Sequence, residues 1–266
     1  MIGIEIKESK IKISGFDLYA RQITVSDDAN SPVLVFLHDA LGCAASWRDF
    51  PEKLCSKTGL NGLVYDRPGY GKSSPNTAKR ETGYLEKEAV NILPKVLGEF
   101  GINATILVGH SDGATIALIH EAKFNRSEAL ISISGHIMVE NITREGVAHT
   151  APTLLNGGQL AKLKSYHGDK AEKLVDSWAD IWLSKNFEHW NISASLDLIK
   201  CPVFIVQGTD DEYATTDHAY LIEKSIGEDA KTVLIEKCGH FPHKEYPEEV
   251  MLHIESFIKN RKDKNQ

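Results

Sequence analysis

The chain has 266 residues, 42% of them hydrophobic and 25% charged, which allows a sizeable buried core and argues against wholesale disorder. Acidic residues outnumber basic ones by 37 to 30, and the formal charge of -7 argues against nucleic acid as a partner. We find neither a signal-peptide pattern nor the roughly 18 apolar residues of a membrane span, so we expect a cytoplasmic protein without a membrane partner.

The first segments along the chain alternate between apolar and polar residues. This alternation covers residues 2–13 and is followed by residues 16–24, which together predict an antiparallel hairpin or edge strands. Beyond them, apolar runs and helical patterns take turns. The predicted strands are residues 33–38, 62–66, 104–109, 129–135, 202–208 and 232–239. The predicted helices are residues 46–59, 84–100, 114–124, 216–226 and 247–262, the second of them bent by Pro94.

Apolar strands that alternate with helices are typical of a mostly parallel sheet with helices on both faces. We therefore expect an α/β fold with a sheet of about eight strands. Residues 136–199 break the alternation, because they contain several short helical patterns and no strand between them. The sequence thus predicts a core made of residues 1–135 and 200–266, with residues 136–199 inserted as an all-helical cap.

The four cysteines are far apart in the sequence and form no C-x-x-C pair. Their spacing fits neither a zinc site nor a disulfide framework, so we expect small buried side chains. No H-E-x-x-H motif or comparable ligand set occurs, and "GYGKSS" (69–74) lacks the first glycine of a phosphate-binding loop, because Asp66 stands there. We predict no metal, no nucleotide and no other cofactor.

A serine between two glycines stands where a predicted strand gives way to a helix. Gly109-His-Ser-Asp-Gly113 fits G-x-S-x-G, and a sharp strand-to-helix turn leaves no room for side chains at the two glycines. Such a turn exposes the Ser111 hydroxyl above the sheet at a helix N-terminus, where backbone N–H groups can stabilise an oxyanion. The alternative is a buried serine that only caps a helix.

A nucleophilic serine needs a base, and the base needs an acid that orients it. Two later strands are followed by suitable residues. "VQGTDDEYA" (206–214) supplies a cluster of acids, and "KCGHFPHKEYPEEV" (237–250) supplies His240 after a glycine. The chain order of serine, acid and histidine is that of the α/β-hydrolase triad.

The chain resembles the α/β-hydrolase superfamily over nearly its full length. Four parts carry the resemblance: "FLHDALG" (36–42), "YDRPGYGKSS" (65–74), "GHSDG" (109–113) and the pair "QGTDDEY"/"CGHFPHKEYPEEV". The resemblance implies Ser111 as the nucleophile, His240 as the base and Asp211 as the acid, with Asp210 and Glu212 as alternatives. His110 and His243 are interpreted as packing residues.

The resemblance also implies an oxyanion hole made by the backbone N–H groups of Asp112 and Ala40. Here the sequence departs from the family, because the usual His-Gly is His38-Asp39. Asp39 either points away and stabilises its loop or tunes chemistry and substrate choice.

We name four residues as candidates to line the substrate pocket. They are His38, Asp39, Trp178 and Trp182, and the two tryptophans share a helical face at i, i+4. The tryptophans either pack the cap onto the core or line an apolar pocket over Ser111.

The sequence therefore predicts a cofactor-independent serine hydrolase of the carboxylesterase type, acting on an ester-like bond of a small molecule through an acyl-enzyme. Carbon–carbon bond hydrolase, thioesterase, lactonase and acyltransferase remain alternatives on the same triad, and a small-molecule receptor is the non-enzymatic one. The oligomeric state and the natural substrate are not predicted.

Overall fold

The computed structural model describes residues 3–264, and the side chains among them through Arg261. Its centre is one eight-stranded sheet in the order β1-β2-β4-β3-β5-β6-β7-β8. The strands are β1 (Glu5–Ile13), β2 (Phe16–Thr24), β3 (Val33–Leu37), β4 (Gly62–Tyr65), β5 (Thr105–His110), β6 (Ala129–Ile133), β7 (Val203–Gly208) and β8 (Ala230–Ile235). Strands β1 and β2 pair antiparallel at one edge, β2 joins β4 antiparallel, and the other pairs are parallel.

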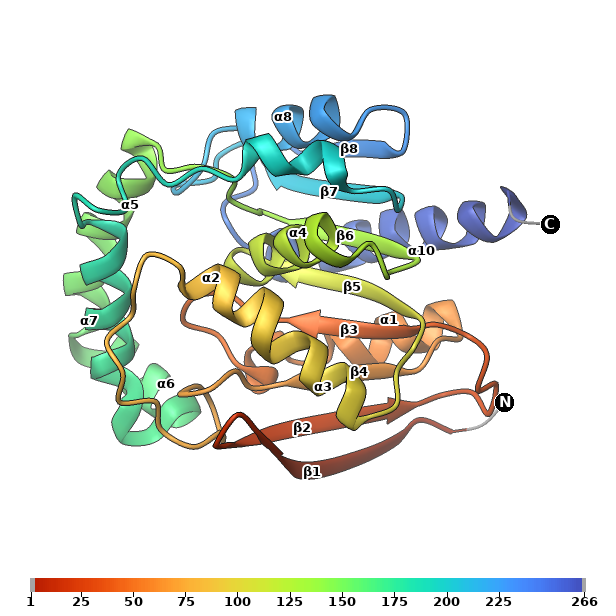
Figure 1. Cartoon of the computed structure of the whole chain (residues 1–266). Coiled ribbons are helices and arrows are strands. Elements are labelled where there is room, and N and C mark those ends of the chain that lie inside the picture. Colours follow the sequence, from red (N-terminus) through yellow and green to blue (C-terminus); the bar gives the residue numbers. More distant parts are fainter. Residues whose placement is uncertain (1–2, 265–266) are drawn as a thin grey trace.

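Helices cover both faces of this sheet (Figure 1). The α-helices are α1 (Phe50–Thr58), α2 (Tyr84–Lys87), α3 (Leu93–Glu99), α4 (Asp112–Phe124), α5 (Asn141–Leu154), α6 (Gly157–His167), α7 (Ala171–Trp182), α8 (Asp217–Ile226), α9 (Pro242–Glu245) and α10 (Pro247–Lys264). Short segments of tighter or wider helix are η1 (Ala44–Trp47), η2 (Glu88–Ile92), η3 (Gly168–Lys170) and η4 (Ser193–Leu198). The predicted α/β class and mostly parallel sheet are confirmed.

The inner strands are buried on both faces because helices lie above and below them. Alternate residues of β3 belong to two separate cores. Leu34 and Phe36 contact the core beneath α1 and α10, whereas Val35 and Leu37 contact the core that includes α4 and the inserted helices. The continuous apolar runs in the sequence therefore reflect a sheet that is buried on both sides.

Most predicted boundaries differ from the structure by one or two residues, and three predicted elements differ more. The predicted helix 46–59 is divided into η1 and α1, because Arg48 has a φ of 56° between them. The predicted helix 84–100 contains the wide segment η2 just before Pro94, whose missing N–H removes a bond of the regular helical ladder. Strand β8 ends at Ile235, before the turn at Lys237, whose φ is 55°.

The chain between β6 and β7 forms α5, α6, α7 and the short segments η3 and η4. In Figure 1 these three α-helices stand together at one end of the sheet. A single antiparallel bridge between Met138 and Asn191 joins the beginning and the end of this segment. We call residues 136–199 the helical insertion; their division from the core as a separate domain stays a prediction. In the described part of the chain, no helix is long and apolar enough to cross a bilayer.

Candidate active site

Ser111 lies at the sharp turn between β5 and α4. Its backbone has φ 53° and ψ −120°, a conformation that L-residues rarely adopt and that surrounding structure must hold in place. The two flanking glycines explain how the turn closes. A Cβ at Gly109 would lie 2.4 Å from Ala114 Cα, and one at Gly113 would lie 1.9 Å from the Leu37 carbonyl oxygen. Both approaches are shorter than atoms tolerate, so only glycine fits at either position.

His240 contacts the serine from the loop after β8. Its Nε2 is 2.9 Å from Ser111 Oγ, and its Nδ1 is 2.8 and 3.0 Å from the two carboxylate oxygens of Asp211. In this arrangement the Nδ1–H donates to Asp211, which leaves Nε2 free to accept the serine proton. The three residues come from the ends of β5, β7 and β8, and all three are buried. The structure thus brings the predicted nucleophile, base and acid together in one row.

Asp211 is held in place by further hydrogen bonds. Its carboxylate accepts from the Gln207 side-chain amide at 2.6 Å and from the Tyr213 backbone N–H at 2.9 Å. The two alternative acids lie elsewhere: Asp210 accepts from the Thr209 hydroxyl, and Glu212 accepts from the backbone N–H of His240. Only Asp211 of the three touches the imidazole ring.

The charge of Asp211 controls the proton affinity of the imidazole. Burial alone would lower the pKa of His240, but the adjacent Asp211 carboxylate outweighs it, so that the pKa is raised above its ordinary value of 6.5. In turn, burial would raise the pKa of Asp211, whereas His240 and the Tyr213 N–H lower it to about 2. Asp211 is therefore ionised at neutral pH and orients a histidine that titrates above its usual range.

The two predicted oxyanion-hole residues flank the serine. Ala40, in the loop after β3, and Asp112, the first residue of α4, both line the pocket that contains Ser111. The first N–H groups of an α-helix have no acceptor within the helix, so the Asp112 N–H points out of the helix end. Both residues therefore border the pocket that contains Ser111, and their role as oxyanion donors stays a prediction.

Arg67 connects the loop that carries Ala40 with Asp112 at the start of α4. No role for it was predicted from the sequence. Its guanidinium donates to the backbone oxygens of Asp39 at 2.7 Å and His38 at 3.2 Å, and lies 3.7 Å from the Asp112 carboxylate. The side chains of Arg67 and Asp112 are each 1% exposed. The Tyr84 hydroxyl donates to the same carboxylate at 3.0 Å. The only sign of Arg67 in the sequence was a basic residue after the buried strand β4. The groups that it contacts are known only from the structure.

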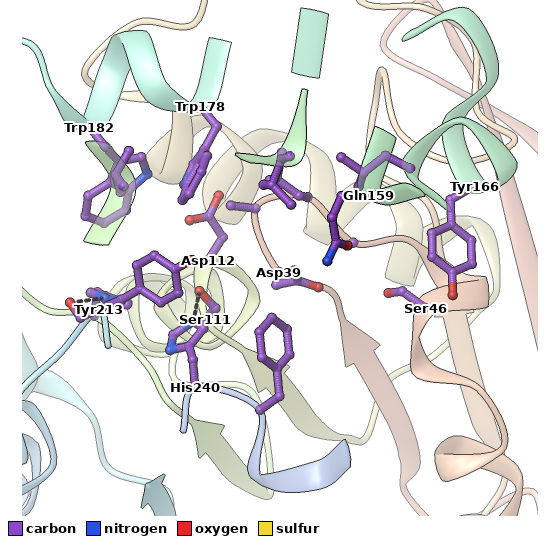
Figure 2. Close-up of a pocket in the computed structure, with 18 of the residues that line it drawn as sticks. Asp39, Ser46, Ser111, Asp112, Gln159, Tyr166, Trp178, Trp182, Tyr213 and His240 are labelled. Carbon is purple, nitrogen blue, oxygen red and sulfur yellow. Dashed lines mark hydrogen bonds between the residues drawn. The ribbon is translucent and has the colours of Figure 1, made fainter. Parts of the chain in front are cut away.

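The pocket over Ser111 has a volume of about 280 Å³ and is shared by the core and the helical insertion. Trp178, Trp182 and Asp39 line this pocket, and their contact with a substrate stays a prediction. Figure 2 shows the two tryptophans toward one end of the pocket, and Ser46 and Tyr166 toward the other. The tryptophans also pack in the core that joins the insertion to the sheet, so that both interpretations hold for them.

The structure places His38 behind the pocket wall instead of in the pocket. Its ring is 1% exposed, accepts the backbone N–H of Arg67 at Nε2 and donates from Nδ1 to the Asp39 carbonyl oxygen. These bonds stiffen the loop that carries Ala40. His110 and His243 pack in the interior, and the four cysteines are free and buried.

Residues 34–251 match the sequence profile of a family described as the alpha/beta hydrolase family. The match spans most of the chain and includes Ser111, Asp211 and His240. The chain belongs to this family. The eight-stranded sheet and the helices on its two faces are the architecture that the sequence resemblance implied.

Curated members of the alpha/beta hydrolase family act on different bonds. Proline iminopeptidase of Lactobacillus helveticus is 23% identical, with 96% of this chain and 98% of the relative covered. 2-Hydroxy-6-oxononadienedioate/2-hydroxy-6-oxononatrienedioate hydrolase of Comamonas testosteroni is 23% identical, with coverages of 85% and 87%. Among solved structures, a bacterial membrane phospholipase A has a TM-score of 0.78 at 20% identity, with coverages of 97% and 87%. These similarities support a hydrolase and leave the bond that it cleaves to be proposed.

Proposed function

We propose that this protein is a serine hydrolase that cleaves an ester-like bond of a small, partly apolar substrate through an acyl-enzyme. One observation carries the proposal: His240 bonds Ser111 Oγ through Nε2 and Asp211 through Nδ1, inside a pocket of substrate size. This is the geometry by which a serine hydroxyl becomes a nucleophile.

In the first step, Ser111 Oγ attacks the ester carbonyl carbon while its proton passes to His240 Nε2. The carbonyl oxygen becomes an oxyanion that accepts from the N–H groups of Ala40 and Asp112. The tetrahedral intermediate then expels the alcohol, which takes its proton from His240. The imidazolium is stabilised meanwhile by the Asp211 carboxylate, whose pKa of about 2 keeps it ionised.

In the second step, water replaces the alcohol. His240 takes a proton from the water, whose oxygen attacks the acyl carbon, and the second tetrahedral intermediate releases the acid as Ser111 Oγ regains its proton. No atom or electron is required from a further reactant. The same residues also suit amide, thioester, lactone and carbon–carbon bonds, and the curated relatives include a peptidase and a carbon–carbon bond hydrolase.

A substrate panel tests the proposal. We expect the enzyme to hydrolyse p-nitrophenyl esters, whereas Ser111→Ala loses on the order of 10³- to 10⁶-fold in kcat. A fluorophosphonate should label the wild-type enzyme and spare this variant. Thioesters, lactones, prolyl amides and vinylogous diketones belong in the same panel. Wild-type-like turnover by Ser111→Ala, or esters that react more slowly than one of these other classes, would contradict the ester proposal.

A further inference from the structure

Positively charged side chains line the pocket away from the tryptophans. Lys244, on α9, and Lys162, on α6, both line it, one from the core and the other from the helical insertion. Among the described residues, Asp39 is the only carboxylate in this part of the pocket wall. The other acid in the wall, Asp112, is already matched by Arg67 and Tyr84. This end of the pocket therefore has two cations, Lys162 and Lys244, and one anion, Asp39. We call it the polar end.

Lys244 is close to the catalytic residues and lacks an anionic partner in contact. Its Nζ lies 4.4 Å above the Phe241 ring, whose centre is 5.4 Å from that of His240. The ammonium is therefore less than about 10 Å from the imidazole, within reach of a small substrate. Among the described residues, no carboxylate lies within 4 Å of it. Burial lowers the pKa of Lys244, which is typical of a cation that has lost water without gaining a close counter-charge.

Asp39 does not neutralise this site by contact. Its carboxylate lies 3.8 Å from His110 Nδ1, and one of its oxygens packs against Gly42, where an added Cβ would be 1.9 Å away. It is thus turned toward its own loop and the interior, and attracts Lys244 only at longer range. The ammonium groups of Lys244 and Lys162 keep a net positive charge at the polar end.

One face of α6 adds neutral hydrogen-bonding groups and apolar walls. Gln159, Lys162, Leu163 and Tyr166 line the pocket, and their spacing of i, i+3, i+4 and i+7 places them on one side of the helix. In Figure 2 the Gln159 amide extends toward Asp39. Lys164 is not in this stripe, and instead forms an ion pair with Glu172. The polar end therefore combines two ammonium groups with an amide and a phenol.

We infer that the polar end of the pocket is a subsite for an anionic group, a carboxylate, carried by the substrate and bound by Lys244 and Lys162. The tryptophan end takes the apolar part of the same molecule. This assignment rests on the proposed function, because it places the anion relative to the bond that Ser111 attacks. It makes the enzyme selective for carboxylate-bearing esters over neutral esters of the same shape.

Matched ester pairs test the subsite on either side of the bond. In the acyl arm, p-nitrophenyl hydrogen glutarate is compared with p-nitrophenyl valerate, which has a methyl group in place of the carboxylate. In the alcohol arm, 4-(carboxymethyl)phenyl butyrate is compared with 4-ethylphenyl butyrate. The quantity measured is the ratio of kcat/KM for the charged ester to that for the neutral ester, so that effects common to both esters cancel.

We expect this ratio to fall about tenfold in Lys244→Met in at least one arm, because a half-buried charged partner is lost. Lys244→Arg should keep most of the ratio, and Lys162→Met should lower it less, because Lys162 is exposed and screened by salt. Asp39→Asn should raise the ratio, since it removes the opposing charge. Lys164→Met, a matched lysine on the same helix, should leave the ratio unchanged.

An unchanged ratio in Lys244→Met in both arms would overturn the subsite. Labelling of Ser111 keeps this outcome separate from failure of the proposed function. Two fluorophosphonates, one ending in a carboxylate and the other in a methyl group, are compared by their labelling rates. If neither labels Ser111, the proposed function fails and the subsite falls with it. If both label Ser111, and the ratio of their two labelling rates is the same in Lys244→Met as in the wild-type enzyme, only the subsite is refuted.

Discussion

The pair of contacts made by His240 has a direct consequence for pH dependence. The base must be neutral to accept the Ser111 proton, and the Asp211 carboxylate raises the pKa of the imidazole above 6.5. We therefore expect kcat/KM to rise with pH through an inflection above 6.5 and then to level off. Asp211→Asn should move the inflection to lower pH, because burial then acts on the pKa without the counter-charge, and should lower kcat on the order of 10⁴-fold.

A pH–rate profile of both proteins on one neutral ester makes this measurement. Asp210→Asn is the control, since its carboxylate accepts a hydrogen bond from the neighbouring Thr209 hydroxyl and, among the described residues, makes none to the imidazole. If the inflection moved as far in Asp210→Asn as in Asp211→Asn, the assignment of the orienting acid would be wrong.

We propose that Arg67 is a positioning residue, because it touches the loop of Ala40 and the carboxylate of Asp112 without lining the pocket over Ser111. Arg67→Met removes two hydrogen bonds to backbone oxygens and takes the nearest positive charge away from the buried Asp112 carboxylate, which keeps its hydrogen bond from Tyr84. We expect kcat to fall about 10- to 100-fold with little change in KM, because the oxyanion donors act on the transition state.

If Arg67 had only a structural role, Arg67→Met would lower the melting temperature, and the folded molecules would keep the wild-type kcat. Titration of active sites with a fluorophosphonate gives that fraction, so that kcat is counted per reactive serine. Lys72→Met, in the same turn but paired with exposed Glu8, is the control and should retain kcat. Equal kcat per site in Arg67→Met and the wild-type enzyme would refute the positioning role.

The sequence identified the residues that lie next to element boundaries, and missed those that act across the fold. Ser111 and His240 could be predicted because each follows a recognisable strand, Ser111 with a glycine two residues away on either side and His240 directly after Gly239. Arg67 and Tyr84 could not, because their importance depends on the Asp112 carboxylate, which α4 brings to them from a distant part of the chain. His38 was misplaced for the same reason: the backbone of Arg67 turns its ring away from the pocket.

At the scale of elements, the joint between β5 and α4 depends on two glycines. In Gly113→Ala, the new methyl group would lie 1.9 Å from the Leu37 carbonyl oxygen, on the strand that carries the oxyanion loop. Backbone atoms cannot move as a side chain can, so β3 and α4 must separate. We expect a loss of at least 1–3 kcal/mol in the free energy of unfolding, measured by urea denaturation.

Gly98→Ala is the matched substitution, because an added Cβ there meets nothing within 4 Å and lies inside α3. It should stabilise the protein by about 0.5–1 kcal/mol, since alanine favours the helix. A Gly113→Ala protein that is as stable as Gly98→Ala would show that β3 and α4 are not in the close contact described.

Periodicity predicted which elements exist better than it predicted where they end. The strands of the sheet were recognisable because burial on both faces makes each a continuous apolar run. Helix ends depend on local conformation that periodicity does not contain: Arg48 divides the first predicted helix with a φ of 56°, and Pro94 creates the wide segment η2. The order of the strands in space also lay outside the pattern of apolar residues.

At the scale of the whole molecule, several sets of hydrogen bonds attach the helical insertion to the core, including those from Trp182 to Tyr84 and from Trp190 to Glu86. At one end, Glu140 accepts hydrogen bonds from Thr215 and His218, which lie after β7. At the other, Lys170 donates to three backbone oxygens of the turn after β4. The pocket lies between these attachments, since α5, α6 and α7 all contribute residues to its wall. Opening at either end would therefore change the shape of the pocket.

The attachment at Lys170 can be tested apart from the chemistry. Its ammonium donates to the carbonyl oxygens of Tyr70, Gly71 and Ser73 at 3.3, 2.7 and 2.6 Å, and Lys170→Met removes all three hydrogen bonds. We expect faster amide hydrogen exchange in α6 and α7 and a KM raised several-fold, while β5 and β6 exchange as in the wild-type protein. Lys173→Met, which loses one exposed bond to Thr77, should change exchange less. Equal protection of α6 and α7 in Lys170→Met and the wild-type protein would mean that the hydrogen bonds of Lys170 do not hold these helices in place.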